Sequence, residues 1–235
     1  MDHWLLIDIS IVLLYGLQHS LLTTKVAVRI YNRLLPAYTW NASYSLISVA
    51  TLFIGFHYWE PSGVTVYRLV PGSFVYHLSV IGLGLSLFLF FYCFKFTTSF
   101  WQWLGVRQIV LKAMGKELPE YYRVREEGIK RYIRFPHHTC LVFFFWLHPL
   151  ATLDTLLLSI AATIYLYIGT YHQDRRGLRA IGESWADYRR RTNLLFPGPV
   201  AIRRFLSDVG GMSRPSSGKV GQSTAGTPAP APRRA

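Results

Sequence analysis

Residues 128–138 read GIKRYIRFPHH, and after two long apolar runs residues 171–197 read YHQDRRGLRAIGESWADYRRRTNLLFP. The two apolar runs between these quoted segments predict a pair of antiparallel helices, and the charged and aromatic side chains gather at one end of that pair. A hairpin that served only as a membrane anchor would not need His, Arg, Asp, Tyr and Trp concentrated there. The pattern therefore predicts a polar pocket at a membrane surface, able to hold a charged ligand beside an apolar one.

The composition indicates a membrane protein. Apolar residues make up 51% of the 235 residues, yet the formal net charge is +13, a combination typical of membrane proteins with basic cytoplasmic loops. A membrane-spanning helix needs roughly 20 mostly apolar residues. We expect an all-α integral membrane protein of about five transmembrane helices with a C-terminal helical hairpin, in the segments Trp4–Leu22, Ala42–Trp59, Val75–Phe94, Thr139–Ala151 and Leu153–Tyr171. The hairpin is expected to turn at Pro149–Asp154.

The distribution of basic residues predicts the orientation. Of the 25 lysines and arginines, only Arg68 falls in a loop on one side of the five-span arrangement. The positive-inside rule then places the N-terminus outside and the C-terminus in the cytoplasm, with the polar edge of the hairpin facing the cytosol. The basic loops are expected to contact membrane lipid. No nucleic-acid-binding module is visible, so nucleic acid is not expected as a partner.

Two regions are expected, a membrane domain over residues 1–205 and a disordered tail over residues 206–235. The tail is rich in Gly, Ser, Pro, Ala and Arg and has too little apolar content to fold. Cys93 and Cys140 have no CxxC partner and are expected to be packed thiols.

The segment around Pro136 is the first candidate for a ligand site. Proline ends or kinks a helix that enters it and frees backbone groups, and a helix N-terminus beside Arg134 could seat a carboxylate. His137 and His138 could act as acid, base or hydrogen-bonding groups. Adjacent residues on a helix point about 100° apart, and no HxxxH or HExxH pattern is present, so no metal site is expected.

The second candidate is the segment that leaves the last span. Asp174 could accept hydrogen bonds from an ammonium or from ribose hydroxyls, or it could instead pair with Arg175 or an arginine of a nearby loop. Trp185, Tyr188 and Arg189 are expected on one helical face, either over the pocket or at the lipid surface.

Two further motifs have both a structural and a functional interpretation. The segment 18–20, QHS, could serve interhelical hydrogen bonding or a site. Arg107 and Gln108 follow two tryptophans that suggest an interfacial helix, from which they could also reach a ligand.

The order and spacing of these motifs resemble the isoprenylcysteine carboxyl methyltransferase-like family of membrane methyltransferases. That family carries Gly-x-Tyr-x-x-x-Arg-His-Pro, a helical hairpin, and then an acidic Glu-Glu pair with distal tyrosines. The nearer likeness is to its methanethiol S-methyltransferase and NnrU-like branch, which has Gln-His-Ser after the first span and Leu-Arg-Gln-Val in the third loop. Here the corresponding residues are 18–20 and 106–109, and the likeness covers residues 13–197.

Four elements of the family pattern, five residues in all, are replaced here. Lys130 replaces its Tyr, Phe135 replaces the His of Arg-His-Pro, Gln173-Asp174 replaces Glu-Glu, and Trp185 replaces a distal Tyr. The resemblance implies an S-adenosyl-L-methionine site formed by the residues Lys130, Phe135, Pro136, His137, His138, Gln173, Asp174 and Tyr188. It also implies catalytic roles for Arg134, His137 and His138, whose charge and basicity would favour a thiolate.

The function expected from this resemblance is S-adenosylmethionine-dependent methylation of a small or lipophilic thiol, carried out in the bacterial inner membrane. Methyl transfer to a thiol needs chiefly an oriented, desolvated nucleophile. The alternatives are a non-catalytic NnrU-like accessory protein of the same fold, or a lipid double-bond reductase on a related scaffold. The methyl acceptor and the oligomeric state cannot be read from the sequence.

Overall fold

The computed structural model describes residues 3–96, 99–118, 124 and 126–212. Most of these residues are helical, and one short antiparallel sheet is present among them. The elements in chain order are α1 (His3–Leu22), α2 (Lys25–Leu34), η1 (Ala37–Thr39), α3 (Trp40–His57), β1 (Thr65–Arg68), α4 (Phe74–Cys93), α5 (Phe100–Trp103), α6 (Val106–Ala113), η2 (Gly128–Arg131), α7 (Pro136–Trp146), β2 (Leu150–Thr152), α8 (Leu153–Ile181), α9 (Glu183–Arg191) and α10 (Pro199–Met212).

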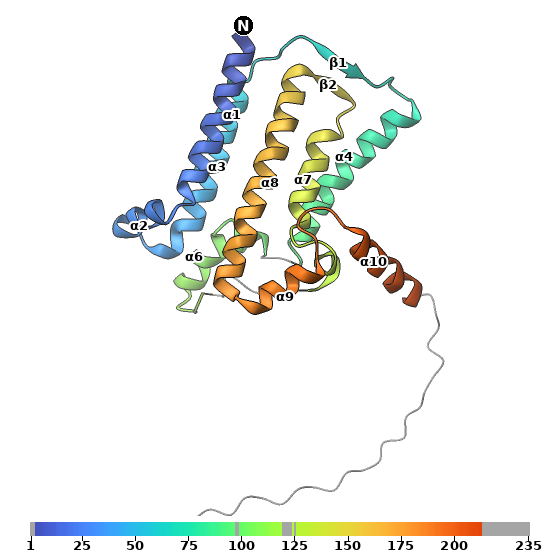
Figure 1. The fold of residues 1–235 in the computed structure, drawn as a ribbon. Helices are drawn as coiled ribbons and strands as arrows, with labels where there is room; N and C mark the ends of the chain where they lie inside the picture. Colours follow the sequence, from blue (N-terminus) through green and yellow to red (C-terminus); the bar gives the residue numbers. More distant parts are fainter. Residues whose placement is uncertain (1–2, 97–98, 119–123, 125, 213–235) are drawn as a thin grey trace, which may run out of the picture.

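A helical bundle is built from α1, α3, α4, α7 and α8 (Figure 1). Helix α1 packs on α3, α4 packs on α7, and α8 contacts both α1 and α7, so that it joins the two pairs. Gly55 allows α1 and α3 to approach closely, because a Cβ at this position would come within 2.9 Å of Ile11 Cγ2. Each of the five apolar segments expected to span the membrane contributes a helix to this bundle.

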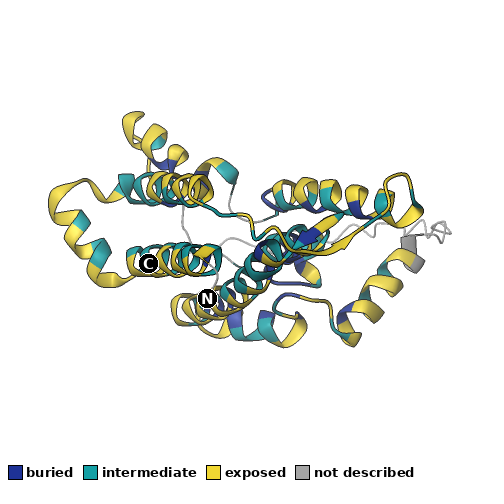
Figure 2. Cartoon of the chain, turned by 90° about the horizontal axis from the view of Figure 1, so that it is seen from above, coloured by how far each residue is buried: buried dark blue, intermediate teal, exposed yellow. Residues whose placement is uncertain are grey.

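The outward faces of the bundle are apolar and uncovered. Figure 2 shows exposed residues along most of the helix surfaces, and the exposed fractions reach 65% for Leu13, 70% for Phe53 and 63% for Phe88. Among the described residues, α1, α4 and α8 are long and apolar enough to cross a membrane. Soluble proteins rarely expose so much contiguous apolar surface. The chain is an all-α integral membrane protein, as its composition predicts.

The two other bundle helices are less clearly membrane-spanning. Helix α3 carries Asn41, Ser43 and His57 near its ends, which lower its hydropathy. Helix α7 has only 11 residues, about 16 Å of helix at 1.5 Å per residue, and cannot cross a 30 Å hydrocarbon layer alone. The count of five crossings therefore stays a prediction.

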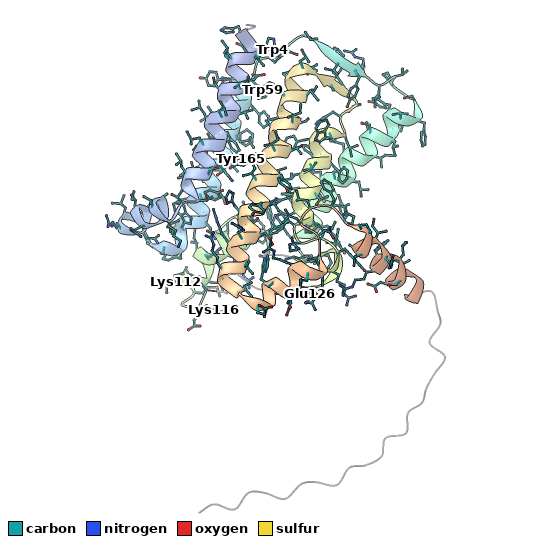
Figure 3. The ribbon with its side chains drawn as sticks, in the orientation of Figure 1. Trp4, Trp59, Lys112, Lys116, Glu126 and Tyr165 are labelled. Atoms are coloured by element: carbon teal, nitrogen blue, oxygen red, sulfur yellow. The ribbon has the colours of Figure 1, made fainter. Side chains whose placement is uncertain are left out.

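The two ends of the bundle differ in chemistry. One end carries β1 and β2, and we call it the sheet end; α2, α6 and α9 lie at the other, the basic end (Figure 1). Figure 3 places Trp4 and Trp59 at the sheet end, and Lys112 and Lys116 at the basic end. Arg68 lies in β1, apart from the other described basic residues.

The hairpin between α7 and α8 differs from the expected tight turn. Residues 150–152 are extended and pair antiparallel with β1, with Arg68 opposite Leu150. Asp154, at the start of α8, accepts hydrogen bonds from Ser62 N (3.1 Å), Ser62 Oγ (2.6 Å) and Trp59 Nε1 (3.3 Å). These contacts fix the loop that follows α3 against the hairpin.

Helix α8 is longer than expected and continues ten residues past the predicted end at Tyr171, to Ile181. The apolar run ends there, but the polar residues that follow still support a helix, which stops at Gly182 with φ +72°. Helix α10 likewise continues through Met212, past the expected start of the tail at residue 206. Residues 213–235 and the basic residues Arg123 and Arg125 lie outside the described residues, so the domain boundary stays a prediction.

Candidate functional site

The basic end is closed by a chain reversal that brings the two quoted segments together. Helix α9 turns back beneath α8, and the residues after it run alongside the segment that precedes α7 (Figure 1). Ile133 bridges Asn193 in parallel, Arg134 N donates to Asn193 O at 2.9 Å, and Phe135 N donates to Leu194 O at 3.2 Å. The backbone amides that Pro136 was expected to free are therefore engaged at Arg134 and Phe135 by this neighbouring segment.

The Asp174 carboxylate lies at the centre of this reversal and is only 1% exposed. Arg134 Nε lies 3.1 Å from its Oδ1 and Arg189 Nε lies 3.0 Å from its Oδ2. Trp185 Nε1 also donates to Oδ1, at 3.0 Å. One carboxylate thus connects α8, α9 and the segment before α7. Of the two roles that the sequence left open, the structure places Asp174 in ion pairs. One partner is Arg134, an arginine of the loop before α7, and the other is Arg189 of α9.

Arg134 is itself buried, with 7% of its surface exposed. Its Nη1 donates to the carbonyl of Arg189 at 3.1 Å and also to the carbonyl of Thr192. Burial lowers the pKa of the guanidinium, and the Asp174 carboxylate opposes that shift. Because the ordinary pKa of an arginine lies far above neutral pH, the group stays charged at neutral pH.

A small apolar cluster supports these polar contacts. Phe135, Trp185, Tyr188 and Leu195 are buried together. Tyr188 is fully buried and its hydroxyl donates to Lys130 O at 2.9 Å. Burial raises the pKa of this phenol, so it remains a neutral donor. Tyr188 therefore holds the backbone of η2 against α9.

His137 and His138 lie in the first turn of α7, beside this cluster. Thr170 Oγ1 donates its only proton to Leu166 O at 2.5 Å, so it must accept from His138 Nδ1, which lies 2.7 Å away. In the neutral ring this tautomer leaves the lone pair on Nε2, where His138 can accept a proton. The Phe135 ring stacks on His138 with 5.8 Å between centroids and 8° between planes.

His137 and Lys130 complete this edge. The His137 ring lies 4.2 Å from that of His138 between centroids, and its Nδ1 is buried without a hydrogen-bond partner among the described residues. Lys130 is buried at 8% exposure and lies close enough to His137 for an electrostatic interaction. Buried polar atoms normally have partners, so His137 has hydrogen-bonding capacity left for a ligand.

Gln173 is placed apart from Asp174. Adjacent residues of a helix lie about 100° apart, so Gln173 faces a different side of α8 from the Asp174 ion pairs. Its side chain is partly exposed. On a neighbouring face of α8, Arg176 Nη2 donates to Thr23 Oγ1 at 3.2 Å. The Gln173-Asp174 pair therefore does not present two groups to one ligand atom.

The QHS segment takes part in interhelical hydrogen bonds. His19 contacts Tyr44 Oη through Nε2 at 2.5 Å and Ser48 Oγ through Nδ1 at 3.0 Å, both on α3. Ser20 Oγ lies 3.1 Å from Tyr165 Oη of α8. The contacts of His19 and Ser20 hold α1 against α3 and α8, which is the structural role considered for the motif. The amide of Gln18 is buried without a hydrogen-bond partner among the described residues.

The third-loop motif folds on itself. Gln108 is buried, and its Nε2 donates to Gln102 O at 2.8 Å. Gly105 has φ +84° and lies against the backbone of Asn41 and Ala42, where a Cβ would overlap. The segment therefore anchors α6 beneath the start of α3, while Arg107 remains exposed.

Most of the predicted site residues thus meet at the basic end, and Gln173 lies to one side. Those that meet are Lys130, Arg134, Phe135, Pro136, His137, His138, Asp174 and Tyr188. Sequence reasoning missed Thr170, which orients His138, and Thr192, which binds Arg134. Thr170 stands four residues before Asp174, so helical periodicity alone would have placed it on the same face of α8.

The fold and site together define an integral membrane protein with a polar, histidine-bearing site at one end of its bundle. The chain is similar to proteins named methanethiol S-methyltransferase. The protein of Crocosphaera subtropica is 26% identical over 195 residues, which cover 82% of this chain and 74% of the relative. That of Pseudomonas deceptionensis is 27% identical over 196 residues, with coverages of 82% and 72%.

A vertebrate protein, Nurim of Danio rerio, is 25% identical over 175 residues, which cover 69% of this chain and 60% of the relative. No protein-family model matches the chain. No solved structure matches it significantly. The likeness to the methanethiol S-methyltransferase branch that the motifs indicated is confirmed, and it supports a relationship to methyltransferases.

The packing of Trp185 against α8 gives a testable prediction. A Cβ at Gly177 would lie 2.6 Å from the Trp185 ring, whereas nothing lies within 4 Å of a Cβ at Gly169 in the same helix. We expect Gly177→Ala to lower the free energy of unfolding by about 1–3 kcal/mol through overpacking. Gly169→Ala should leave it unchanged or raise it by up to about 1 kcal/mol. Thermal unfolding in detergent micelles compares the two variants, and equal effects would contradict this account of the reversal.

Proposed function

We propose that the chain is a membrane methyltransferase that uses S-adenosyl-L-methionine to methylate a small or lipophilic thiol, with its cofactor at the basic end. The observation that carries the proposal is the gathering of His137, His138 and Lys130 at one edge, beside the ion pairs of Asp174. The similarity to proteins named methanethiol S-methyltransferase, which extends over most of the chain, supports it.

The residues at this edge fit the chemistry of such a cofactor. Its carboxylate suits a buried cation and a buried imidazole, and Lys130 and His137 offer these together. Its ribose hydroxyls suit an amide, which Gln173 supplies from the neighbouring face of α8. Both oxygens of Asp174 are occupied by Arg134, Arg189 and Trp185. In this proposal Asp174 is a positioning residue and Gln173 touches the cofactor.

S-adenosylmethionine, when bound, supplies an electrophilic methyl group on a sulfonium. The chain must hold a thiol in line with that methyl group, keep water away and accept the S–H proton. His138 Nε2 accepts the proton, because Thr170 holds Nδ1 in its protonated form. Apolar surfaces of α7 and α8 exclude water from the sulfur, which strengthens each of these interactions.

The local charge also favours the thiolate. Two guanidinium groups, Arg134 and Arg189, meet the single Asp174 carboxylate and leave an excess positive charge. A positive environment lowers the pKa of a thiol and raises the fraction present as the nucleophile. In this role Arg134 acts at a distance through its charge, while its hydrogen bonds maintain the fold.

We place the chain in the bacterial inner membrane with the N-terminus outside and the C-terminus in the cytoplasm. The basic end then faces the cytosol, where the cofactor is dissolved, and Arg68 faces outward.

Cofactor binding is tested by calorimetric titration of detergent-purified protein with S-adenosylhomocysteine. We expect His137→Ala and Gln173→Ala each to lose about 1–3 kcal/mol of binding free energy, the cost of a lost polar contact in a buried site. Arg179→Gln, on the exposed side of α8, serves as the control and should bind like the parent. A well-folded protein that shows no binding would reject the proposal and favour the non-catalytic alternative.

The role of His138 is tested by turnover with methanethiol. We expect His138→Ala to keep its affinity for S-adenosylhomocysteine but to lose roughly 10²–10⁴-fold in methyl transfer at neutral pH. The loss should shrink as the pH rises, because the thiol then ionises without help. A pH-independent defect would show that His138 is only structural.

The orientation is tested with Val70→Cys and Lys116→Cys variants in intact cells. Val70 lies at the sheet end and is 70% exposed, and Lys116 lies at the basic end (Figure 3). Both native cysteines are buried. A membrane-impermeant maleimide should label Val70→Cys directly and Lys116→Cys only after permeabilisation. The reverse pattern would overturn the orientation.

A further inference from the structure

Helix α2 lies outside the bundle and across its axis, at the basic end of α1 and α3 (Figure 1). Its position is fixed by hydrogen bonds. Thr24 Oγ1 caps the helix by accepting from Ala27 N at 3.2 Å. Tyr31 Oη lies 2.7 Å from Thr39 Oγ1 and 2.6 Å from Ser43 Oγ. These hydrogen bonds fix the rotation of α2 about its own axis, so the side chains on its other faces point in defined directions.

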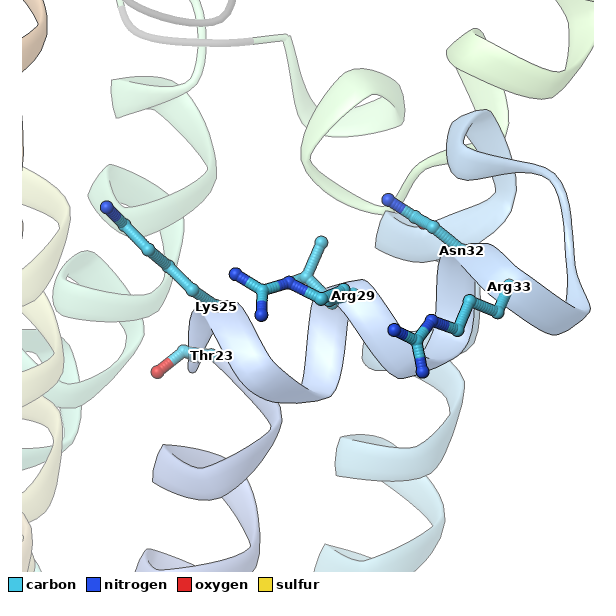
Figure 4. A pocket seen from close by; sticks show the side chains of 6 residues that line it. Thr23, Lys25, Arg29, Asn32 and Arg33 are labelled. Atoms are coloured by element: carbon cyan, nitrogen blue, oxygen red, sulfur yellow. The ribbon is translucent and has the colours of Figure 1, made fainter.

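Two rows of side chains, one cationic and one apolar, run next to each other along α2. Lys25, Arg29 and Arg33 are spaced four residues apart, so they form one row, and Figure 4 shows them along the same helix. All three are exposed. The next position in each turn is apolar, and the exposed fractions are 62% for Val26, 53% for Ile30 and 78% for Leu34. A cationic row beside an uncovered apolar row is typical of a helix lying in a membrane interface.

The cationic row borders an open hollow of about 510 Å³. Its lining holds three cations, one amide and one hydroxyl but no acidic side chain: Thr23, Lys25, Val28, Arg29, Asn32 and Arg33. No carboxylate of the described residues forms an ion pair with these three cations. Arg176 of α8 reaches the rim, where it donates to Thr23 Oγ1 at 3.2 Å.

We propose that α2 binds anionic phospholipids, with the phosphate groups at Lys25, Arg29 and Arg33 and the acyl chains along Val26, Ile30 and Leu34. Each component of such a lipid meets its complement: the phosphate meets cations that have no ion-pair partner among the described residues, and the chains meet apolar side chains that the described part of the chain leaves exposed. An acidic protein or a nucleic acid would leave the apolar row uncovered. A zwitterionic lipid would leave the net charge of the row unbalanced.

This inference is independent of the methyltransferase proposal, because it uses only the membrane location and the surface of α2. It assigns to the first loop a specific lipid contact rather than a general role in orientation. Each basic residue near an anionic surface contributes about 1 kcal/mol to binding, so the row as a whole is expected to select anionic over zwitterionic lipid.

The test is native mass spectrometry of the detergent-purified chain titrated with phosphatidylglycerol or phosphatidylcholine. We expect the parent to bind phosphatidylglycerol more tightly, and Arg29→Gln/Arg33→Gln to weaken that binding about 10- to 30-fold, from about 1 kcal/mol per charge. The matched control is Lys112→Gln/Lys116→Gln, which removes the same charge from exposed residues at the basic end. The control should bind both lipids like the parent.

The proposal is overturned if the α2 variant retains the parent's affinity for phosphatidylglycerol, or if the control loses as much. It is also overturned if inorganic phosphate at equal concentration displaces the lipid, because the site would then recognise the anion without its chains. Thermal unfolding of each variant, measured in the same detergent, shows that a loss of binding does not come from loss of the fold.

Discussion

The basic end depends on a single buried carboxylate. Asp174 sits between two arginines and an indole N–H, and each of these partners belongs to a different part of the chain from α8. A buried ion pair is costly to desolvate, but removing one partner is costlier still, because it leaves an uncompensated charge. The contacts of this carboxylate tie α8 to α9 and to the segment before α7, beside the hydrogen bonds of Tyr188 to η2 and of Thr170 to His138.

Two of the departures from the family pattern are connected by this arrangement. Trp185 stands where the family that the chain resembles has a tyrosine. Its indole N–H donates to the Asp174 carboxylate, and its ring fits against α8 because Gly177 has no side chain. Tyrosine could offer a hydroxyl here but not the same donor in the same plane. Gln173 and Asp174 stand where the family that the chain resembles has its acidic pair, and Asp174 is the one that Trp185 contacts.

Much of the fold could be predicted from the sequence, because long apolar runs identify membrane helices whatever their partners. The gathering of both motifs at one end also followed, since a hairpin brings its ends together. The pairing of Leu150–Thr152 with Thr65–Arg68 was not predicted. Thr65–Arg68 is rich in β-branched and aromatic residues, but the three residues Leu150–Thr152 are too few to show a strand pattern. A loop arginine was expected as one possible partner of Asp174, but the particular partners Arg134 and Arg189 could not be chosen, because several arginines compete for the same carboxylate.

The unbroken length of α8 sets the depth at which the site lies. From Leu153 to Asp174 the helix rises about 31 Å at 1.5 Å per residue, close to the roughly 30 Å thickness of the hydrocarbon layer. The edge that holds His138 and Asp174 therefore lies at the interface between the hydrocarbon layer and water. In the proposed reaction, a charged, water-soluble cofactor and an apolar thiol partition into opposite phases, and this boundary is the place where both reach useful concentrations. The length of a single helix sets the position of the site relative to this boundary. Deleting one turn of α8 would therefore move the site into the hydrocarbon layer, and inserting one turn would move it into water.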